Sequence, residues 1–231
     1  MRVRAVWAAL LVGFFGAPAQ AQKVDLQLVL AVDASGSVSA DRFELQKQGY
    51  VAAFRHPRVQ AVITSGAARA VAVTMVQWTG PWMQVDAVPW TRIGDAASAE
   101  GFAAAIEAAP RRLFGGGTSI SGMIDYAVTL FPRSPFTAER RIVDVSGDGI
   151  NNRGRPVTNA RDDAVAAGMS INGLPILAID PTLDRYYEAN VIGGPGSFVI
   201  AATSYETFAA AILQKLITEI AWRGGAAHAR K

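Results

Sequence analysis

Apolar residues follow two spacings along this chain, and these spacings divide it into expected strands and helices. The first run alternates, with Val24, Leu26, Leu28, Leu30 and Val32 on one side. Its other side is polar at the start and apolar toward the end, which is typical of a strand that becomes buried on both faces. Further runs rich in Val, Ile and aromatic residues predict strands at 69–78, 82–90, 140–146, 169–179 and 197–201.

The helical spacing is clearest after the glycine run at 115–117. Apolar residues recur there at intervals of three and four until Pro132: Ile120, Met123, Ile124, Ala127, Val128 and Phe131. Ser39 and Ser204 are expected to cap two more helices, the first ending before Pro57 and the second close to residue 222. Weaker patterns predict helices at 59–63, 96–109, 158–168 and 183–191.

This alternation of strands and helices predicts an α/β fold, with a doubly wound, mostly parallel sheet and helices on both faces. The runs at 69–78 and 82–90 flank a Gly80-Pro81 turn, which predicts one antiparallel edge strand. Trp78, Trp82 and Trp90 are expected to pack around this hairpin. Ligands of such folds bind beyond the carboxyl ends of the strands, so the loops there are the place to look for chemistry.

Both ends of the chain are expected to lie outside the domain, which should cover 22–223. Arg2, Arg4, the apolar run at 5–16 and the small-residue site before Gln22 predict a secretory signal peptide at 1–21. An uncleaved anchor is the alternative, but the run is short for a bilayer span, so no stable membrane insertion is expected after cleavage. The basic residues 224–231 are expected to form a disordered tail. The predicted location is the periplasm or the extracellular space.

Composition limits the functions that need to be considered. The chain has 231 residues, of which 51% are hydrophobic and 18% charged, as expected for one domain with a full core. Loss of Arg2 and Arg4 would reduce 22 basic residues to 20 against 19 acidic ones, a net charge of +1. That balance predicts no nucleic-acid partner. The chain has no Cys, so core burial alone must stabilise a secreted domain.

The most informative chemistry lies directly after the first expected strand. Asp33, Ser35 and Ser37 alternate there, and Gly36 allows a tight turn between the two serines. A carboxylate and two hydroxyls suit a small hard cation that prefers oxygen ligands. They do not suit zinc or copper, which would need His or Cys.

Two further oxygen-bearing loops are expected at the same edge of the sheet. Thr118 opens a helix behind the glycine run, and Asp148 follows a buried strand within Ser146-Gly147-Asp148-Gly149. Together with Asp33, Ser35 and Ser37 they predict one metal site of five residues. Because no Lys follows Gly117, a nucleotide-binding P-loop is poorly supported.

These five residues, in this order, resemble the metal-ion-dependent adhesion site of the von Willebrand factor A domain. The resemblance covers about 23–222, and the stretches 144–149 and 171–176 are similar to a bacterial group of secreted proteins of unknown function built on this domain. It implies that Ser35 and Ser37 bind the cation directly and that Thr118 binds it directly or through water. Asp33 and Asp148 would hold its waters, or bind the ion directly in some states.

The resemblance also implies the ion and its use. Mg²⁺ is expected, with Mn²⁺ or Ca²⁺ as alternatives. The ion would take a Glu or Asp side chain of a partner protein into its coordination shell, and the domain itself is expected to be a monomer. The last helix corresponds to the element that shifts in some members of that family.

Two other interpretations stay open. A metal-dependent hydrolase or phosphate-handling enzyme could use the same cation, although neither His56 nor His228 is placed as a base and no triad motif occurs. The chain is therefore not expected to be an enzyme. A structural subunit whose metal only stabilises the loops is the third interpretation.

Polar residues before and after the Asp148 loop are not assigned to the metal site by the sequence. Asp144 lies inside an expected buried strand, where a structural hydrogen bond is favoured over a contact with the site. Asn151, Asn152, Arg153 and Arg155 follow the metal loop, and the sequence leaves open whether they touch a partner or only solvent.

Overall fold

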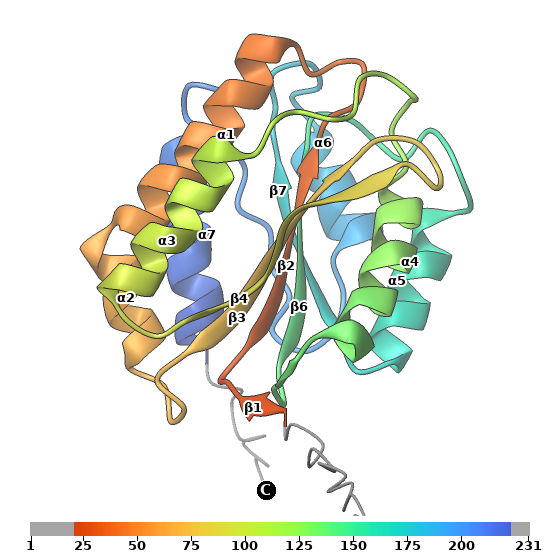
Figure 1. The fold of residues 1–231 in the computed structure, drawn as a ribbon. Helices are drawn as coiled ribbons and strands as arrows, with labels where there is room; N and C mark the ends of the chain where they lie inside the picture. The colour runs from red at the N-terminus through yellow and green to blue at the C-terminus, as the bar shows by residue number, and fades with distance from the viewer. Residues whose placement is uncertain (1–20, 223–231) are drawn as a thin grey trace, which may run out of the picture.

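The computed structural model describes residues 21–222 and has a five-stranded sheet at its centre (Figure 1). The strand order is β4-β3-β2-β6-β7. The strands are β2 (Gln27–Asp33), β3 (Val71–Trp78), β4 (Gln84–Ile93), β6 (Arg141–Gly147) and β7 (Ser170–Pro175). All neighbouring pairs are parallel except β3 and β4, which are antiparallel, so the expected fold class is confirmed.

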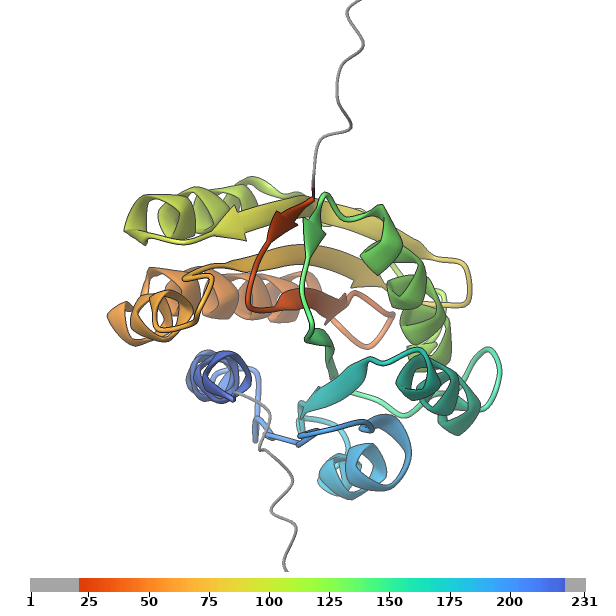
Figure 2. The same cartoon turned by 90° about the horizontal axis from the view of Figure 1, so that it is seen from below.

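Helices cover both faces of this sheet (Figures 1 and 2). One face carries α1 (Ala40–Arg55), α2 (Pro57–Thr64), α3 (Ala96–Ala108) and α7 (Phe208–Ala221). The other carries α4 (Ile120–Leu130) with the short η1 (Phe131–Arg133), α5 (Val157–Ala166), and α6 (Leu183–Tyr186) with its π-helical continuation η2 (Tyr187–Val191). None of the helices within 21–222 is long and apolar enough to span a bilayer.

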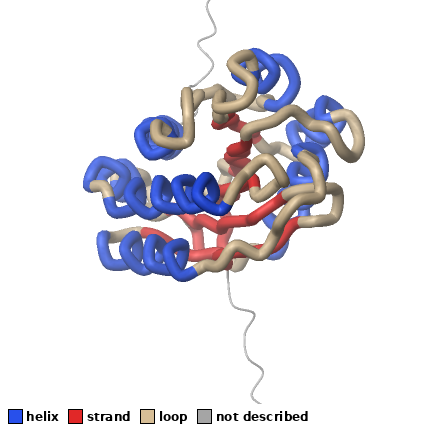
Figure 3. Tube along the Cα trace, turned by 90° about the horizontal axis from the view of Figure 1, so that it is seen from above, coloured by secondary structure: helices blue, strands red, loops and turns tan. Residues whose placement is uncertain are grey.

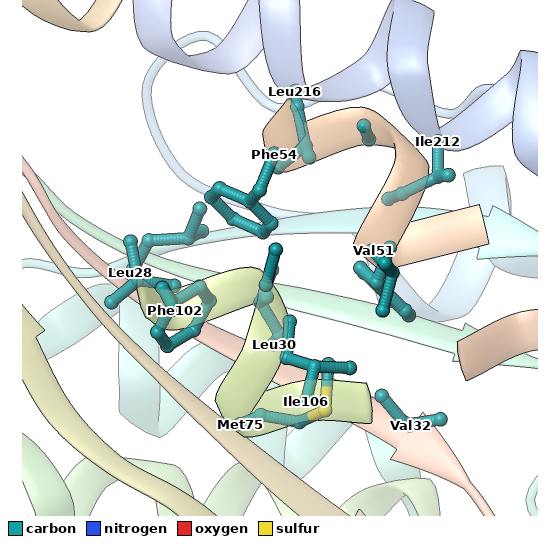
Figure 4. Packing of buried hydrophobic residues seen from close by; sticks show 14 of the residues in the cluster. Leu28, Leu30, Val32, Val51, Phe54, Met75, Phe102, Ile106, Ile212 and Leu216 are labelled. Atoms are coloured by element: carbon teal, nitrogen blue, oxygen red, sulfur yellow. The ribbon is translucent and has the colours of Figure 1, made fainter. Parts of the chain in front are cut away.

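The alternation of side chains along β2 explains why the core has two halves. Leu28 and Leu30 pack with α1, α3 and α7, and Val29 and Ala31 pack under α4 and α5. Figure 4 shows the first half, where the rings of Phe54 and Phe102 meet edge to face with centroids 4.8 Å apart. β2 is thus buried on both faces and holds its carboxyl end rigidly.

The amino-terminal strand is shorter than the sequence predicts. Residues 22 and 23 form β1 (Gln22–Lys23), which pairs with β5 (Phe136–Thr137) away from the main sheet. The Asp25 carboxylate separates β1 from β2 because it accepts hydrogen bonds from the backbone N–H groups of Ala68 and Ala70. Residues 1–20 of the expected signal peptide and the expected tail at 224–231 lie outside the described residues.

Three other expectations about local structure are wrong. The run 197–201 is not a strand, since only Val199 within it bridges β7, and left-handed Gly194 and Gly196 turn the chain just before it. The last helix begins at Phe208 rather than after Ser204, because Ser204 donates its N–H to Thr207 Oγ1 within a turn. β7 ends at Pro175 rather than at 179, because its partner β6 ends at Gly147, whose carbonyl accepts the last N–H of this pairing from Ile176 at 2.9 Å.

The hairpin is also packed differently. Trp78 is fully buried, but Trp82 stands 94% exposed at the tip of the β3–β4 turn. Trp82 adopts a left-handed backbone conformation with φ of 60°, which turns its ring away from the strands. Trp82 therefore adds nothing to the core.

Candidate functional site

The loops that follow β2 and β6 meet at one end of the sheet, which Figure 3 shows from above. Asp33 is the last residue of β2, and its Oδ1 accepts the N–H of Ser35 at 2.7 Å. This bond closes the tight turn that the spacing of Asp33, Ser35 and Ser37 predicts. Asp33 Oδ2 accepts the N–H of Asp148 at 3.4 Å, so the same carboxylate joins the two loops.

The hydroxyl groups of Ser35 and Ser37 add further hydrogen bonds between the loops that follow β2 and β6. Ser37 Oγ donates to Asp148 Oδ1 at 2.5 Å, and Ser35 Oγ lies 3.2 Å from Ser37 Oγ. Asp33, Ser35 and Asp148 are buried, whereas Ser37 is exposed. The structure thus brings four of the five sequence-predicted residues into one hydrogen-bonded cluster that faces solvent at Ser37.

Thr118 lies beside this cluster without joining its hydrogen bonds. Its side chain is next to the Asp148 loop, since a Cβ on Gly149 would lie 3.7 Å from Thr118 Oγ1. Its backbone is fixed from two sides, because Thr118 N–H donates to Asn152 Oδ1 at 2.9 Å and its carbonyl accepts the N–H of Asn152. Thr118 therefore lies next to the Asp148 loop, at the same end of the sheet as the four hydrogen-bonded residues.

Glycines make this close approach feasible. Gly115, Gly116 and Gly117 all have left-handed backbones, with φ of 83°, 94° and 80°. A Cβ on Gly116 would lie 2.9 Å from Thr79 Oγ1 and from Met83 Sδ, too close for any side chain. The same holds at the end of β6, where a Cβ on Gly147 would lie 2.9 Å from Asp33 Oδ2.

The site holds two buried carboxyl groups whose charges disfavour each other. Burial raises the pKa of Asp33 to about 7, and the nearby charge of Asp148 adds to the effect. Among the described residues Asp33 has no ion pair, and Asp148 has only Arg42 at 4.0 Å. Two buried carboxyl groups with only this distant ion pair fit a divalent ion.

The donor set indicates which kind of ion fits. Within 21–222 no group of three or more His, Cys, Asp and Glu comes together, so the donors here are two carboxylates and three hydroxyls. Hard cations such as Mg²⁺ accept such oxygen donors and keep several waters. Asp33, Ser35, Ser37, Thr118 and Asp148 could hold such an ion.

Sequence reasoning missed two neighbours of the site. Tyr205, in the turn before α7, donates its hydroxyl to Asp148 Oδ2 at 2.8 Å. Arg42, in the first turn of α1, lies over the Tyr205 ring at 5.1 Å and donates to the Ser37 carbonyl at 3.0 Å. Burial raises the pKa of Tyr205 well above its usual range, and the Asp148 charge adds to this, so its hydroxyl stays a donor. No local motif marks either residue, because both contacts depend on tertiary packing.

The asparagines after the metal loop have structural roles. Asn152 holds Thr118, and Asn151 Oδ1 accepts the N–H of Ser121 at 2.9 Å at the start of α4. Arg155 forms ion pairs with Asp125 and Asp163 at 2.5 and 2.6 Å. Of the four polar residues that the sequence left open, Asn152 and Arg153 are exposed, and Arg153 forms no ion pair among the described residues.

A family model described as "Protein of unknown function (DUF1194)" matches residues 23–224. The chain belongs to this family. Comparison with curated proteins found no match.

Solved structures similar to this DUF1194 protein have the von Willebrand factor A fold. They include proximal thread matrix protein 1 from the mussel byssus with a zinc-occupied MIDAS motif (TM-score 0.60, 16% identity, 87% of this chain and 48% of that chain). The pilus adhesin SpaC from Lactobacillus rhamnosus GG also matches (TM-score 0.60, 14% identity, 86% of this chain and 31% of that chain). A von Willebrand factor type A protein from Catenulispora acidiphila has a TM-score of 0.57 and 14% identity over 86% of this chain and 43% of that chain.

This DUF1194 chain spans half or less of the length of those three neighbours. At these identities the likeness shows the fold alone. The expected resemblance to the von Willebrand factor A domain is confirmed at that level.

Proposed function

We propose that this DUF1194 protein is a secreted binding domain that uses a divalent cation to capture a Glu or Asp side chain of a partner protein. The observation that carries the proposal is the hydrogen-bonded cluster of Asp33, Ser35, Ser37 and Asp148, which brings two buried carboxyl groups and two hydroxyls together. Mg²⁺ is the proposed ion, and Mn²⁺ or Ca²⁺ would use the same oxygen donors.

Each residue has a distinct role in this proposal. Ser35, Ser37 and Thr118 would supply neutral oxygen donors, and Asp33 and Asp148 would balance the charge. A bound cation would supply an electrophilic position for a carboxylate oxygen. Ser37 is the exposed member of the cluster, so a partner would approach from its side.

Neighbours support a binding role. One solved neighbour is described as a pilus adhesin, and another has a zinc-occupied MIDAS motif. Binding rather than catalysis is proposed also because His56 is used to cap α2, where its Nδ1 accepts the N–H of Arg58 at 3.1 Å. The proposed domain works as a monomer in the periplasm or outside the cell and has no nucleic-acid partner.

Affinity capture tests this proposal directly. The mature protein, its Ser35→Ala variant and a Ser134→Ala control would be immobilised and exposed to periplasmic extract with Mg²⁺ or with EDTA. Ser134 lies at the opposite end of the sheet, where its Oγ accepts the N–H of Phe136. A partner should be retained by wild type and Ser134→Ala in Mg²⁺ only, and Ser35→Ala should lose it. Partners held equally in EDTA would contradict metal-dependent capture.

A further inference from the structure

Exposed hydrophobic side chains are concentrated at the end of the molecule that carries the metal site. Within 21–222 the large exposed ones are Trp82, Met83, Phe114, Ile150 and Ile179. Trp82 and Met83 follow β3, Ile150 follows β6, Ile179 follows β7, and Phe114 lies in the loop that enters α4. Because β3, β6 and β7 run parallel, these loops share one end of the sheet (Figure 3). Such a gathering marks an interaction surface.

Met83 and Phe114 lie beside the glycine loop that leads to Thr118. Met83 Sδ would be 2.9 Å from a Cβ on Gly116, so Met83 covers that loop. Phe114 is 70% exposed and stacks on Arg111, whose guanidinium carbon lies 4.9 Å from the ring centroid. Arg111 donates in turn to the Ala34 carbonyl at 3.0 Å, inside the serine loop. Phe114 is therefore fixed relative to the site.

Trp82 is presented to solvent by its backbone. A left-handed conformation is unfavourable for a bulky residue, and such strain is typical of functional positions. Beneath it lies a cavity of about 360 Å³, which Pro81, Trp82, Ser119, Gly122 and Tyr126 help to line. Ser119 follows Thr118 in the chain and caps α4, so this cavity lies at the start of the helix that Thr118 precedes.

We propose that Trp82, Met83 and Phe114 form an apolar rim that packs against apolar side chains flanking the captured Glu or Asp of the partner protein. This inference rests on the proposed function and specifies the partner's surface: one carboxylate surrounded by apolar residues. Positively charged residues near the rim fit that partner. Arg112 and Arg153 are exposed beside the glycine loop, and neither forms an ion pair with a described residue, so both complement an acidic segment.

A protein surface fits this rim better than a lipid surface. The rim adjoins a polar cluster of buried carboxylates and an exposed serine, and a bilayer would bury those groups without offering the cation a fixed carboxylate. Aromatic anchors around one polar contact are instead typical of protein interfaces.

Synthetic peptides of defined sequence test the rim. Each carries a central Glu flanked either by Leu or by Ser, and a matched Leu-flanked peptide carries Gln. Binding is measured in Mg²⁺ by fluorescence anisotropy for wild type, Trp82→Ala, Phe114→Ser, Ser35→Ala and Ile179→Ser. Ile179 is the matched control, because it is exposed at the same end but follows β7, at the far edge of the sheet from the β3–β4 turn.

The expected result separates the rim from the metal site. Wild type and Ile179→Ser should bind the Leu-flanked Glu peptide about tenfold more tightly than the Ser-flanked one. Trp82→Ala and Phe114→Ser should lose this preference but still bind the Ser-flanked peptide like wild type. Ser35→Ala or EDTA should abolish binding of both. Acrylamide quenching of Trp82 fluorescence should fall when the Leu-flanked peptide binds.

Other results would distinguish the two proposals. Metal-dependent binding with no flank preference would overturn the rim and leave the proposed function intact. A flank preference that persists in EDTA and with the Gln peptide would support the rim and contradict acid capture. No binding of the Leu-flanked peptide at millimolar concentration would overturn the rim, as would Trp82-dependent sedimentation with phosphatidylglycerol vesicles, which would identify a lipid surface.

Discussion

Two pairs of buried carboxyl groups each include a residue of β6 or of the loop that follows it, and the two pairs differ in their nearest cation. Asp144 in mid-strand and Glu219 on α7 share the ammonium group of Lys215, with O···N distances of 2.6 and 2.5 Å. Asn172 also donates to Glu219 Oε1 at 2.7 Å. At the end of the strand, Asp148 and Asp33 have only Arg42 at 4.0 Å from Asp148. The first pair has an internal cation, and the second does not.

This difference separates an ion-paired structural cluster from the pair of carboxyl groups that we propose binds a cation. The cluster of Asp144, Lys215 and Glu219 is inaccessible to solvent and joins α7 to the sheet. The pair at the proposed metal site contacts the exposed Ser37, which donates to Asp148 Oδ1. Tyr205 connects the two regions, because the turn that leads into α7 donates to Asp148.

Removing the internal cation should have the largest effect. Lys215→Met leaves two buried carboxylates unpaired, and we expect the free energy of unfolding to fall by about 3–5 kcal/mol. Urea denaturation in EDTA measures this without any contribution from metal.

Two variants control for the loss of a lysine. Lys47→Met breaks the partly exposed pair with Glu44 at 2.9 Å and should cost less than about 1 kcal/mol. Neutralising the whole cluster in Asp144→Asn/Lys215→Met/Glu219→Gln should recover much of the loss. Equal losses of unfolding free energy for Lys215→Met and Lys47→Met would show that the buried cluster does not stabilise the packing of α7 on the sheet.

The internal pair should also make stability depend on pH. Burial raises the pKa of Asp144 from 3.8 to about 7, repulsion by Glu219 adds to this, and Lys215 opposes it. The folded state therefore holds this proton longer than the unfolded chain does. Wild type should lose stability relative to Asp144→Asn as pH rises from about 4 to about 7, by at most about 1.4 kcal/mol per unit.

Urea titrations of both proteins at several pH values test this difference. Asp162→Asn on the surface of α5 serves as the control for the loss of one carboxylate, because Asp162 is exposed in its ion pair with Arg161. A flat difference for Asp144→Asn would mean that Lys215 keeps Asp144 ionised throughout.

Sequence reasoning reached the metal-site pair but not the internal one. Asp33, Ser35, Ser37 and Asp148 each follow a strand with a strong apolar pattern, and parallel strands bring their loops to one end. Lys215 and Glu219 each precede an apolar residue of α7 by one position, so the helical pattern places them beside the buried stripe and does not reveal their burial. Only packing of α7 against β6 and β7 brings them to Asp144.

The same reasoning separates correct from wrong local predictions. The helix start at Ser39 is confirmed because its cap depends on neighbouring residues, with Ser39 Oγ accepting the N–H of Arg42. The exposure of Trp82 was missed because a left-handed backbone at a tryptophan contradicts the general preference for burying aromatic residues. A helix cap can thus be predicted from neighbouring residues, whereas an unusual backbone conformation such as that of Trp82 cannot.

An external cation should stabilise the second pair as Lys215 stabilises the first. At about 100 times its dissociation constant, Mg²⁺ or Mn²⁺ should add about 2.7 kcal/mol to the free energy of unfolding and raise the melting temperature. Ser35→Ala and Asp148→Ala should abolish the shift, whereas Ser134→Ala should keep it. Lys215→Met should also keep it, provided it folds. An unchanged shift in Ser35→Ala and Asp148→Ala would refute the assignment of the site.

The smallest effect concerns the residue between the two regions. Tyr205→Phe keeps the ring under Arg42 but removes the hydroxyl that donates to Asp148 Oδ2, so we expect a loss of about 1 kcal/mol of stability in EDTA. Because the freed oxygen no longer shares its lone pairs with Tyr205, Mg²⁺ affinity should rise by a factor of about two to five, as measured by calorimetric titration. Tyr126→Phe is the matched control, since its hydroxyl donates to surface Asp86 at 2.9 Å and should leave the affinity unchanged. A fall in affinity as large as that of Asp148→Ala would instead mean that Tyr205 holds the carboxylate in its binding position.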